Sequence, residues 1–183
     1  MKLPDLTILD EKDKRLRLIS EPVTFPLSNE DKKNIQDMLD YLKMSQIDEY
    51  REKYDLRAGM GLSYIQIGVA KRIFVVVDET EPGIFQNYII VNPEITSKSE
   101  ELIYVGEGEG CLSINRETVG IVPRNARMTL NAYDLEGKPF TIRVREDLSV
   151  AFQHEIDHLN GILFTDKIDP KNPYKNANKM REI

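Results

Sequence analysis

The chain has 183 residues, 40% of them hydrophobic and 31% charged, a composition typical of one globular domain. The formal net charge of −6 argues against a direct role on DNA, and no segment approaches the ~20 apolar residues of a membrane span. The first residues lack the apolar core of a signal peptide, and a single cysteine cannot form a disulfide within the chain. We therefore expect one cytoplasmic domain over residues 1–183, with no membrane association.

A helical region follows an extended lead-in over residues 1–27, which contains three prolines. Ser28 can cap a helix whose apolar positions recur at helical spacing, namely Ile35, Met38, Leu39 and Leu42. A second, charged helical stretch follows at about residues 46–55. We expect these two helices to form one packing layer of the domain.

Strand patterns fill the middle of the chain. We expect strands at residues 72–77, 88–92, 101–105, 127–133 and 140–144, with turns at 81–83 and 135–138. A further short strand, 162–165, precedes a polar tail over about residues 166–183. Because short strands surround one helix, the predicted fold class is α+β, with mostly antiparallel sheets packed around that central helix.

The predicted central helix carries the only two histidines of the chain, His154 and His158, in the sequence His-Glu-Ile-Asp-His. Apolar residues recur at helical spacing through this stretch, with Asp147 or Ser149 as the expected cap and Asn160-Gly161 as the stop. Residues four apart share one face of a helix, so both imidazoles can bind a single divalent metal. The histidines fall beside the apolar face, which places the metal at the rim of the core.

Glu155 lies beside the two histidines, where it can hold and deprotonate a water molecule at the metal. A catalytic site usually has three protein ligands and one open position. Phe164 stands where one zinc-peptidase pattern has a third histidine, and Glu182 in the polar tail is a poor candidate. The only cysteine, Cys111, follows the glycine-rich loop 106–110 and is the one soft ligand upstream, with burial as a small apolar residue as the alternative.

Three separated motifs resemble those of the peptide deformylase family. Residues 59–66, Gly-Met-Gly-Leu-Ser-Tyr-Ile-Gln, are similar to its GxGLAAxQ motif. Residues 109–113 match its EGCLS motif, and residues 153–158 match its QHExDH motif. Their order and rough spacing also fit, and the chain resembles the longer, type 2 form of the family.

The first motif departs from the family pattern, because Ser63 and Tyr64 stand where the two alanines are usual and Ile65 follows them. A tyrosine is much larger than an alanine. We therefore expect a changed cleft beside Gln66 and a changed affinity for substrates.

The resemblance implies the family's α+β fold and a hydrolase that removes the formyl group from N-formylmethionyl ends of nascent peptides, releasing formate. It implies a single catalytic domain in which Cys111, His154 and His158 bind one divalent metal. Fe(II) is the expected ion, and Ni(II), Co(II) or Zn(II) can substitute. A transient association with the ribosome is also expected, since the substrates are nascent peptides.

The resemblance further implies roles for the residues around the metal. Glu155 would move a proton from the attacking water to the leaving amine. The Gln66 side-chain amide and the Leu112 N–H are similar to the donors that stabilise the oxyanion in the family. Glu109 and Arg124 match positions that pair as ions. Two glycines, Gly61 and Gly110, would let the substrate backbone come close. Three apolar residues would form the pocket for the methionine side chain, with core packing as the alternative role: Met60, Val150 and Ala151.

Two other functions fit the same residues. One is a different metallohydrolase, such as an aminopeptidase or another amidase, which an assay of formylated against free peptides would separate. The other is a non-catalytic protein with a closed metal site. There an Asp or Glu would have to supply the fourth ligand, because no further Cys or His exists.

Overall fold

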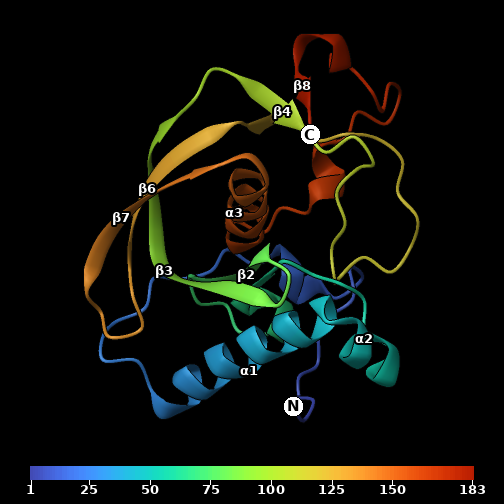
Figure 1. The fold of residues 1–183 in the computed structure, drawn as a ribbon. Helices are drawn as coiled ribbons and strands as arrows, with labels where there is room; N and C mark the ends of the chain where they lie inside the picture. Colours follow the sequence, from blue (N-terminus) through green and yellow to red (C-terminus); the bar gives the residue numbers. More distant parts are fainter.

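The computed structural model describes residues 1–183. Its larger sheet is antiparallel and has five strands (Figure 1). Its strand order is β1-β2-β3-β6-β7, with bounds Gly61–Ser63, Ile73–Glu81, Ile84–Lys98, Arg127–Tyr133 and Pro139–Arg145. A smaller sheet has the strand order β5-β4-β8, with bounds Arg124–Asn125, Leu102–Tyr104 and Arg181–Glu182. Strand β4 pairs antiparallel with β5 and parallel with β8. The predicted α+β class with mostly antiparallel sheets is confirmed.

Strand β2 has a helix on each of its faces. One set of alternating side chains packs with α1 (Asn29–Gln46), namely Ile73, Val75 and Val77. The other set packs with α3 (Glu146–Leu159), namely Phe74 and Val76. Successive side chains of a strand point to opposite faces, so a strand covered on both faces is apolar throughout rather than alternating.

Helix α3 runs through the centre of the molecule, and the larger sheet curves around one side of it (Figure 1). Its apolar stripe is anchored by Phe152, whose ring meets Phe74 of β2 edge-on at 5.3 Å and Tyr88 of β3 at 5.6 Å between centroids. Ile156 and Leu159 continue this stripe into the same cluster. The packing of the stripe sets the rotation of the helix, and hence the direction in which its two histidines point.

The N-terminal helices agree with the prediction in part. Helix α1 begins after Ser28, whose Oγ accepts a hydrogen bond from the Asp31 N–H at 3.0 Å, and its predicted apolar face is buried. Helix α2 (Asp48–Tyr54) forms where predicted but has no buried residue, so α1 alone provides the packing layer. None of the helices is both long enough and apolar enough to span a membrane.

The predicted cap of α3 is wrong, whereas its predicted end is right. The helix begins at Glu146, directly after β7, without any side-chain cap. Ser149 lies inside the helix, and its hydroxyl donates to the Asn125 carbonyl at 2.7 Å, because β5 runs alongside. At the other end Gly161 has a φ of 72°, a conformation that favours glycine and stops the helix.

The segment after α3 also differs from the prediction. Residues 162–165 do not form a strand: Phe164–Lys167 is a short 3-10 helix (η3), because the Asp166 carboxylate accepts the Leu163 N–H at 2.9 Å and closes a turn. The polar tail is docked onto the domain. Its strand β8 pairs with β4, and the Gly106 N–H donates to the Ile183 carbonyl at 3.2 Å.

The expected effect of Tyr64 on a cleft is wrong, because this side chain is fully buried in the cluster beneath α1. Its hydroxyl donates to the Asp31 carbonyl oxygen at 2.8 Å, and the Asp31 carboxylate pairs with Lys71 Nζ at 2.7 Å. Burial raises the pKa of Tyr64 far above its usual range, so the phenol remains protonated and keeps donating. Tyr64 therefore joins the sheet to α1.

Substitution of Tyr64 should lower stability. Tyr64→Phe removes one buried hydrogen bond and should reduce the free energy of unfolding by about 1 kcal/mol. Tyr64→Ala also leaves a cavity and should reduce it by about 3–5 kcal/mol. Urea unfolding measures both, with Tyr174→Phe, at a residue that is 55% exposed, as the control. A Tyr64→Ala protein as stable as the unmodified chain would contradict this packing role.

Candidate metal centre

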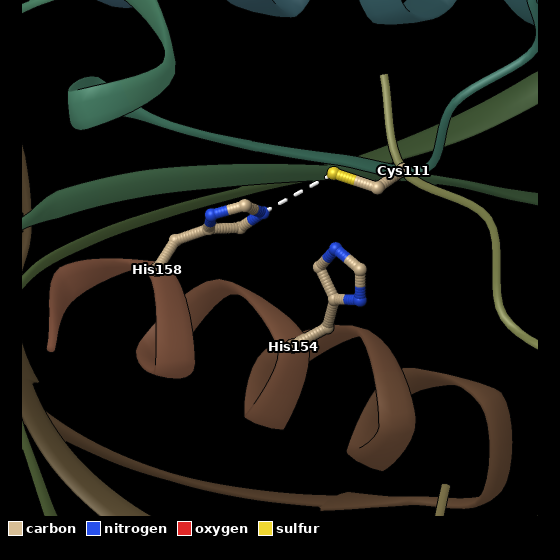
Figure 2. Close-up of side chains that lie close together, drawn as sticks. All are labelled: Cys111, His154 and His158. Atoms are coloured by element: carbon tan, nitrogen blue, oxygen red, sulfur yellow. Dashed lines mark hydrogen bonds between the residues drawn. The ribbon is translucent and has the colours of Figure 1, made fainter. Parts of the chain in front are cut away.

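Cys111, His154 and His158 converge on one point, as the ligand prediction requires. Their ligand atoms all lie within 4.8 Å of one another, and Cys111 Sγ is 3.3 Å from His158 Nε2. Figure 2 shows the two histidines on successive turns of α3, both directed toward Cys111 on the loop opposite. All three residues are buried, and the cluster contains no fourth protein ligand of the kind a closed structural site requires.

His154 is held in one orientation by a buried carboxylate. Its Nδ1 lies 2.9 Å from Glu109 Oε1, so Nδ1 donates its hydrogen there and leaves the Nε2 lone pair for a metal. Burial raises the pKa of Glu109, but its hydrogen bonds with Arg124 and His154 outweigh burial and lower that pKa to about 2. Glu109 is therefore an ionised acceptor at neutral pH.

Arg124 joins the two sides of this site. Its guanidinium donates to both oxygens of Glu109 at 2.8 Å and to Asp157 Oδ2 at 2.6 Å. Glu109 lies two residues before Cys111, whereas Asp157 lies on α3 next to His158. One buried cation thus ties the cysteine loop to the histidine helix.

The donor set fits a divalent transition metal. Burial, with the nearby His154 and Arg124, lowers the pKa of His158 well below its usual range, so its imidazole is neutral as a ligand must be. Its Nδ1 is buried without a hydrogen-bond partner, which leaves Nε2, facing Cys111, as the coordinating atom. One sulfur and two imidazole nitrogens suit ions such as Fe(II), Co(II), Ni(II) and Zn(II).

Glu155 lies beside the ligands without joining their cluster. Burial raises the pKa of this carboxyl to about 7, against the lowering effect of His154 and of a hydrogen bond from Ser63. Gly61 provides the space for it, since a Cβ at that position would lie 2.4 Å from Glu155 Oε1. A carboxyl with a pKa near neutrality is suited to accept and return a proton.

Two hydrogen-bond donors lie near Cys111. The Gln66 side-chain Nε2 is 3.6 Å from Cys111 Sγ and 3.1 Å from Ser113 Oγ. Its Oε1 accepts the Ser63 N–H at 2.9 Å, which sets the orientation of the amide. The Leu112 N–H has no acceptor within the protein and is free to donate to a ligand.

All the predicted site residues except His158 line one cavity of roughly 320 Å³. Those lining it are Met60, Gly61, Gln66, Gly110, Cys111, Leu112, Val150, Ala151, His154 and Glu155. Met60, Val150 and Ala151 supply apolar wall, and a Cβ at Gly110 would meet no protein atom within 4 Å. The cavity wall therefore contains two of the three proposed ligands as well as apolar residues.

Sequence reasoning missed two charged residues of the cavity wall, Arg57 and Asp147. Arg57 donates to the Cys111 carbonyl at 3.0 Å and to Asn115 Oδ1 at 2.6 Å, so it holds the cysteine loop in place. Its only sequence signal is its place just before the first motif. Asp147 was assigned to the cap of α3, but it lies in the first turn and borders the cavity.

Loss of the Glu109 charge should weaken both the fold and the metal site. Glu109→Gln leaves Arg124, which is 2% exposed, with Asp157 alone, and should lower the free energy of unfolding by about 3–5 kcal/mol. Metal affinity should fall about 10–100-fold, because His154 loses its orienting carboxylate. Urea unfolding of the apo protein and chelator competition for Co(II) measure the two effects, with Glu107→Gln on the same loop as control. Unchanged values in both would refute this role.

The same substitution should change the acid stability. Glu109 has a folded pKa of about 2, below the ~4.3 expected when unfolded, so its contribution is complete above pH ~4.3 and is lost as pH falls toward 2. The stability of Glu109→Gln should therefore fall less steeply in that window. Equal slopes for the two proteins would count against the ionised pair.

Comparisons with known proteins agree with this site. The Polypeptide deformylase family model matches residues 6–174. Peptide deformylase 2 of Geobacillus stearothermophilus is 45% identical over 92% of this chain and 91% of its own length. The peptide deformylase of Ligilactobacillus salivarius is 45% identical over 91% of each chain.

Solved structures show the same relationship. A plant peptide deformylase superimposes with a TM-score of 0.77 at 27% identity, covering 98% of this chain and 88% of its own. The peptide deformylase of Thermotoga maritima superimposes with a TM-score of 0.71 at 30% identity, covering 90% and 98%. The chain therefore belongs to the peptide deformylase family, metal-dependent hydrolases that remove the formyl group from formylmethionyl nascent peptides.

Proposed function

We propose that deformylation takes place in this cavity, with Cys111, His154 and His158 holding one divalent metal. The observation that supports this most is the convergence of these three buried side chains, two of which, Cys111 and His154, line a cavity together with the predicted substrate-binding residues. When bound, the metal supplies positive charge for the formyl oxygen and acidity for the attacking water. Fe(II) is the proposed ion, as the family resemblance implies, and Ni(II), Co(II) or Zn(II) substitute for it.

Glu155 acts as the general base and then as the general acid. Its carboxylate takes a proton from the attacking water and passes it to the nitrogen as the C–N bond breaks, so that formate and a free amine leave. The Gln66 side-chain amide and the Leu112 N–H donate to the oxyanion that forms between these steps. Both donors border the cavity, and the Leu112 N–H has no competing acceptor.

The substrate's methionine side chain lies against the apolar wall of the cavity. This wall is formed by Met60, Val150 and Ala151. Burial of the substrate's apolar side chain against these residues favours binding of formylmethionyl ends. Gly61 and Gly110 let the peptide backbone pass close to the metal. We also propose that residues 1–183 act as one catalytic domain, in the cytoplasm and in transient contact with the ribosome, because nascent peptides are the substrates.

Glu155→Ala should bind metal normally and lose turnover. General acid–base groups contribute about 10²–10⁴ in rate, so kcat on a formyl-Met-peptide should fall by that factor. Metal content should remain one ion per chain, because Glu155 is not a ligand in the cluster. Glu117→Ala, at an exposed residue, provides the control. Near-normal turnover of the metal-loaded variant would refute the assignment.

The iron-loaded protein should lose activity in air faster than the nickel-loaded protein. A coordinating cysteine is a thiolate, the form that oxidises, and Fe(II) reacts with oxygen beside it. No second cysteine exists to form a protective disulfide. Apo protein is loaded with each metal and exposed to air, and deformylation is followed together with the mass of the Cys111 peptide. Equal lifetimes of the two metal-loaded proteins in air, with an unmodified Cys111, would contradict this oxidation argument.

A further inference from the structure

Glu155 has one hydrogen-bonding partner among the side chains, Ser63, which is one of the residues that depart from the family motif. Ser63 is fully buried, and its Oγ lies 2.8 Å from Glu155 Oε2 and 2.9 Å from the Glu155 carbonyl oxygen. Its single hydroxyl hydrogen is therefore directed at this one glutamate. No protein group hydrogen-bonds to the other carboxylate oxygen, Oε1.

Strand β1 contacts the two carboxylate oxygens of Glu155 through different residues. Gly61 and Ser63 are two residues apart, so both face α3. Gly61 lies next to Oε1, where a Cβ would come within 2.4 Å, and it lines the cavity. Ser63 does not line the cavity, and its hydroxyl donates a hydrogen bond to Oε2. The strand thus holds Oε2 by a hydrogen bond, whereas Oε1 lies beside Gly61, a residue of the cavity wall.

The same residue, Ser63, also orients the side-chain amide of Gln66. The Ser63 backbone N–H donates to Gln66 Oε1 at 2.9 Å, which turns Gln66 Nε2 toward Ser113 and Cys111. This second contact uses the main chain and does not depend on the side chain. The serine hydroxyl therefore acts on Glu155 alone, and removing it leaves the Gln66 contact in place.

We propose that Ser63 is a positioning residue for deformylation in this protein. Its hydroxyl fixes Oε2 of Glu155, so that Oε1 is the oxygen that takes the proton from the attacking water and returns it to the leaving nitrogen. This inference rests on the proposed role of Glu155. An alanine at position 63, which the family motif has, leaves the carboxylate to be held by packing alone.

The test is Ser63→Ala in the metal-loaded protein. We expect kcat on a formyl-Met-peptide to fall about ten- to hundredfold, the range expected for a hydrogen bond to a charged group. KM should stay within twofold, because Ser63 does not border the cavity, and the metal content should not change. A kcat within twofold of the unmodified protein, or a change in KM alone, would overturn the proposal.

Ser149→Ala is the matched control for a purely structural effect. Ser149 is also fully buried, but its hydroxyl donates to the Asn125 carbonyl and not to Glu155. Both variants should lose stability in urea unfolding, and only Ser63→Ala should lose kcat. An equal loss of kcat in Ser149→Ala would show that Ser63 acts through stability, which overturns the proposal.

A double variant separates this inference from the role of Glu155. In a Glu155→Gln background, Ser63→Ala should lower the residual rate less than twofold, because the group that it positions no longer takes the proton. A further ten- to hundredfold loss there would overturn the proposal. Normal turnover of Glu155→Ala would refute the role of Glu155 as the base. If Glu155→Ala is inactive and Ser63→Ala has a normal kcat, only the positioning role of Ser63 is refuted.

Discussion

The buried guanidinium of Arg124 is the interaction on which the rest of the site depends. It is 2% exposed and neutralised by Glu109 and Asp157, which lie on two segments far apart in the sequence. An unpaired charge in that position would be costly, so the cysteine loop and α3 must meet for the chain to fold stably. Because Glu109 also accepts from His154, the same ion pair orients a proposed metal ligand. Folding and metal binding are therefore coupled through one cation.

Each part of the site comes from a segment that is held by something other than the metal. Helix α3 is fixed by its apolar stripe, through Phe152 and its aromatic neighbours. The cysteine loop is held by hydrogen bonds from Arg57 and from the buried Arg124. Strand β1 pairs with β2 and carries Ser63 to the back of Glu155. A site held in this way keeps its geometry while the substrate enters and leaves, which favours catalysis by positioning.

Several features of the fold and site could be predicted because they depend on local pattern. The spacing of His154 and His158 on a helix, the cap at Ser28 and the turn residue Gly161 each follow from local geometry. The limits of the strands could not, and β3 extends over Ile84–Lys98, far beyond the predicted 88–92. Most of its added residues are polar and exposed, so they belong to the strand because β2 and β6 pair with them, not because of their own propensity.

Residue chemistry and spacing were sufficient to recognise the family and to propose the three ligands and the adjacent glutamate, and the structure places the proposed ligands together. The tertiary structure decided which neighbours act with them. Tyr64 and Ser63 are adjacent in the sequence and both depart from the motif, yet Tyr64 is buried under α1 and Ser63 reaches Glu155. The chain turns from β1 into the 3-10 helix η2 (Tyr64–Ile67) between them, so the two side chains point to different parts of the core. Side-chain direction at such a turn depends on the surfaces that pack against it, and those surfaces come from residues 33 and 92 positions away in the sequence.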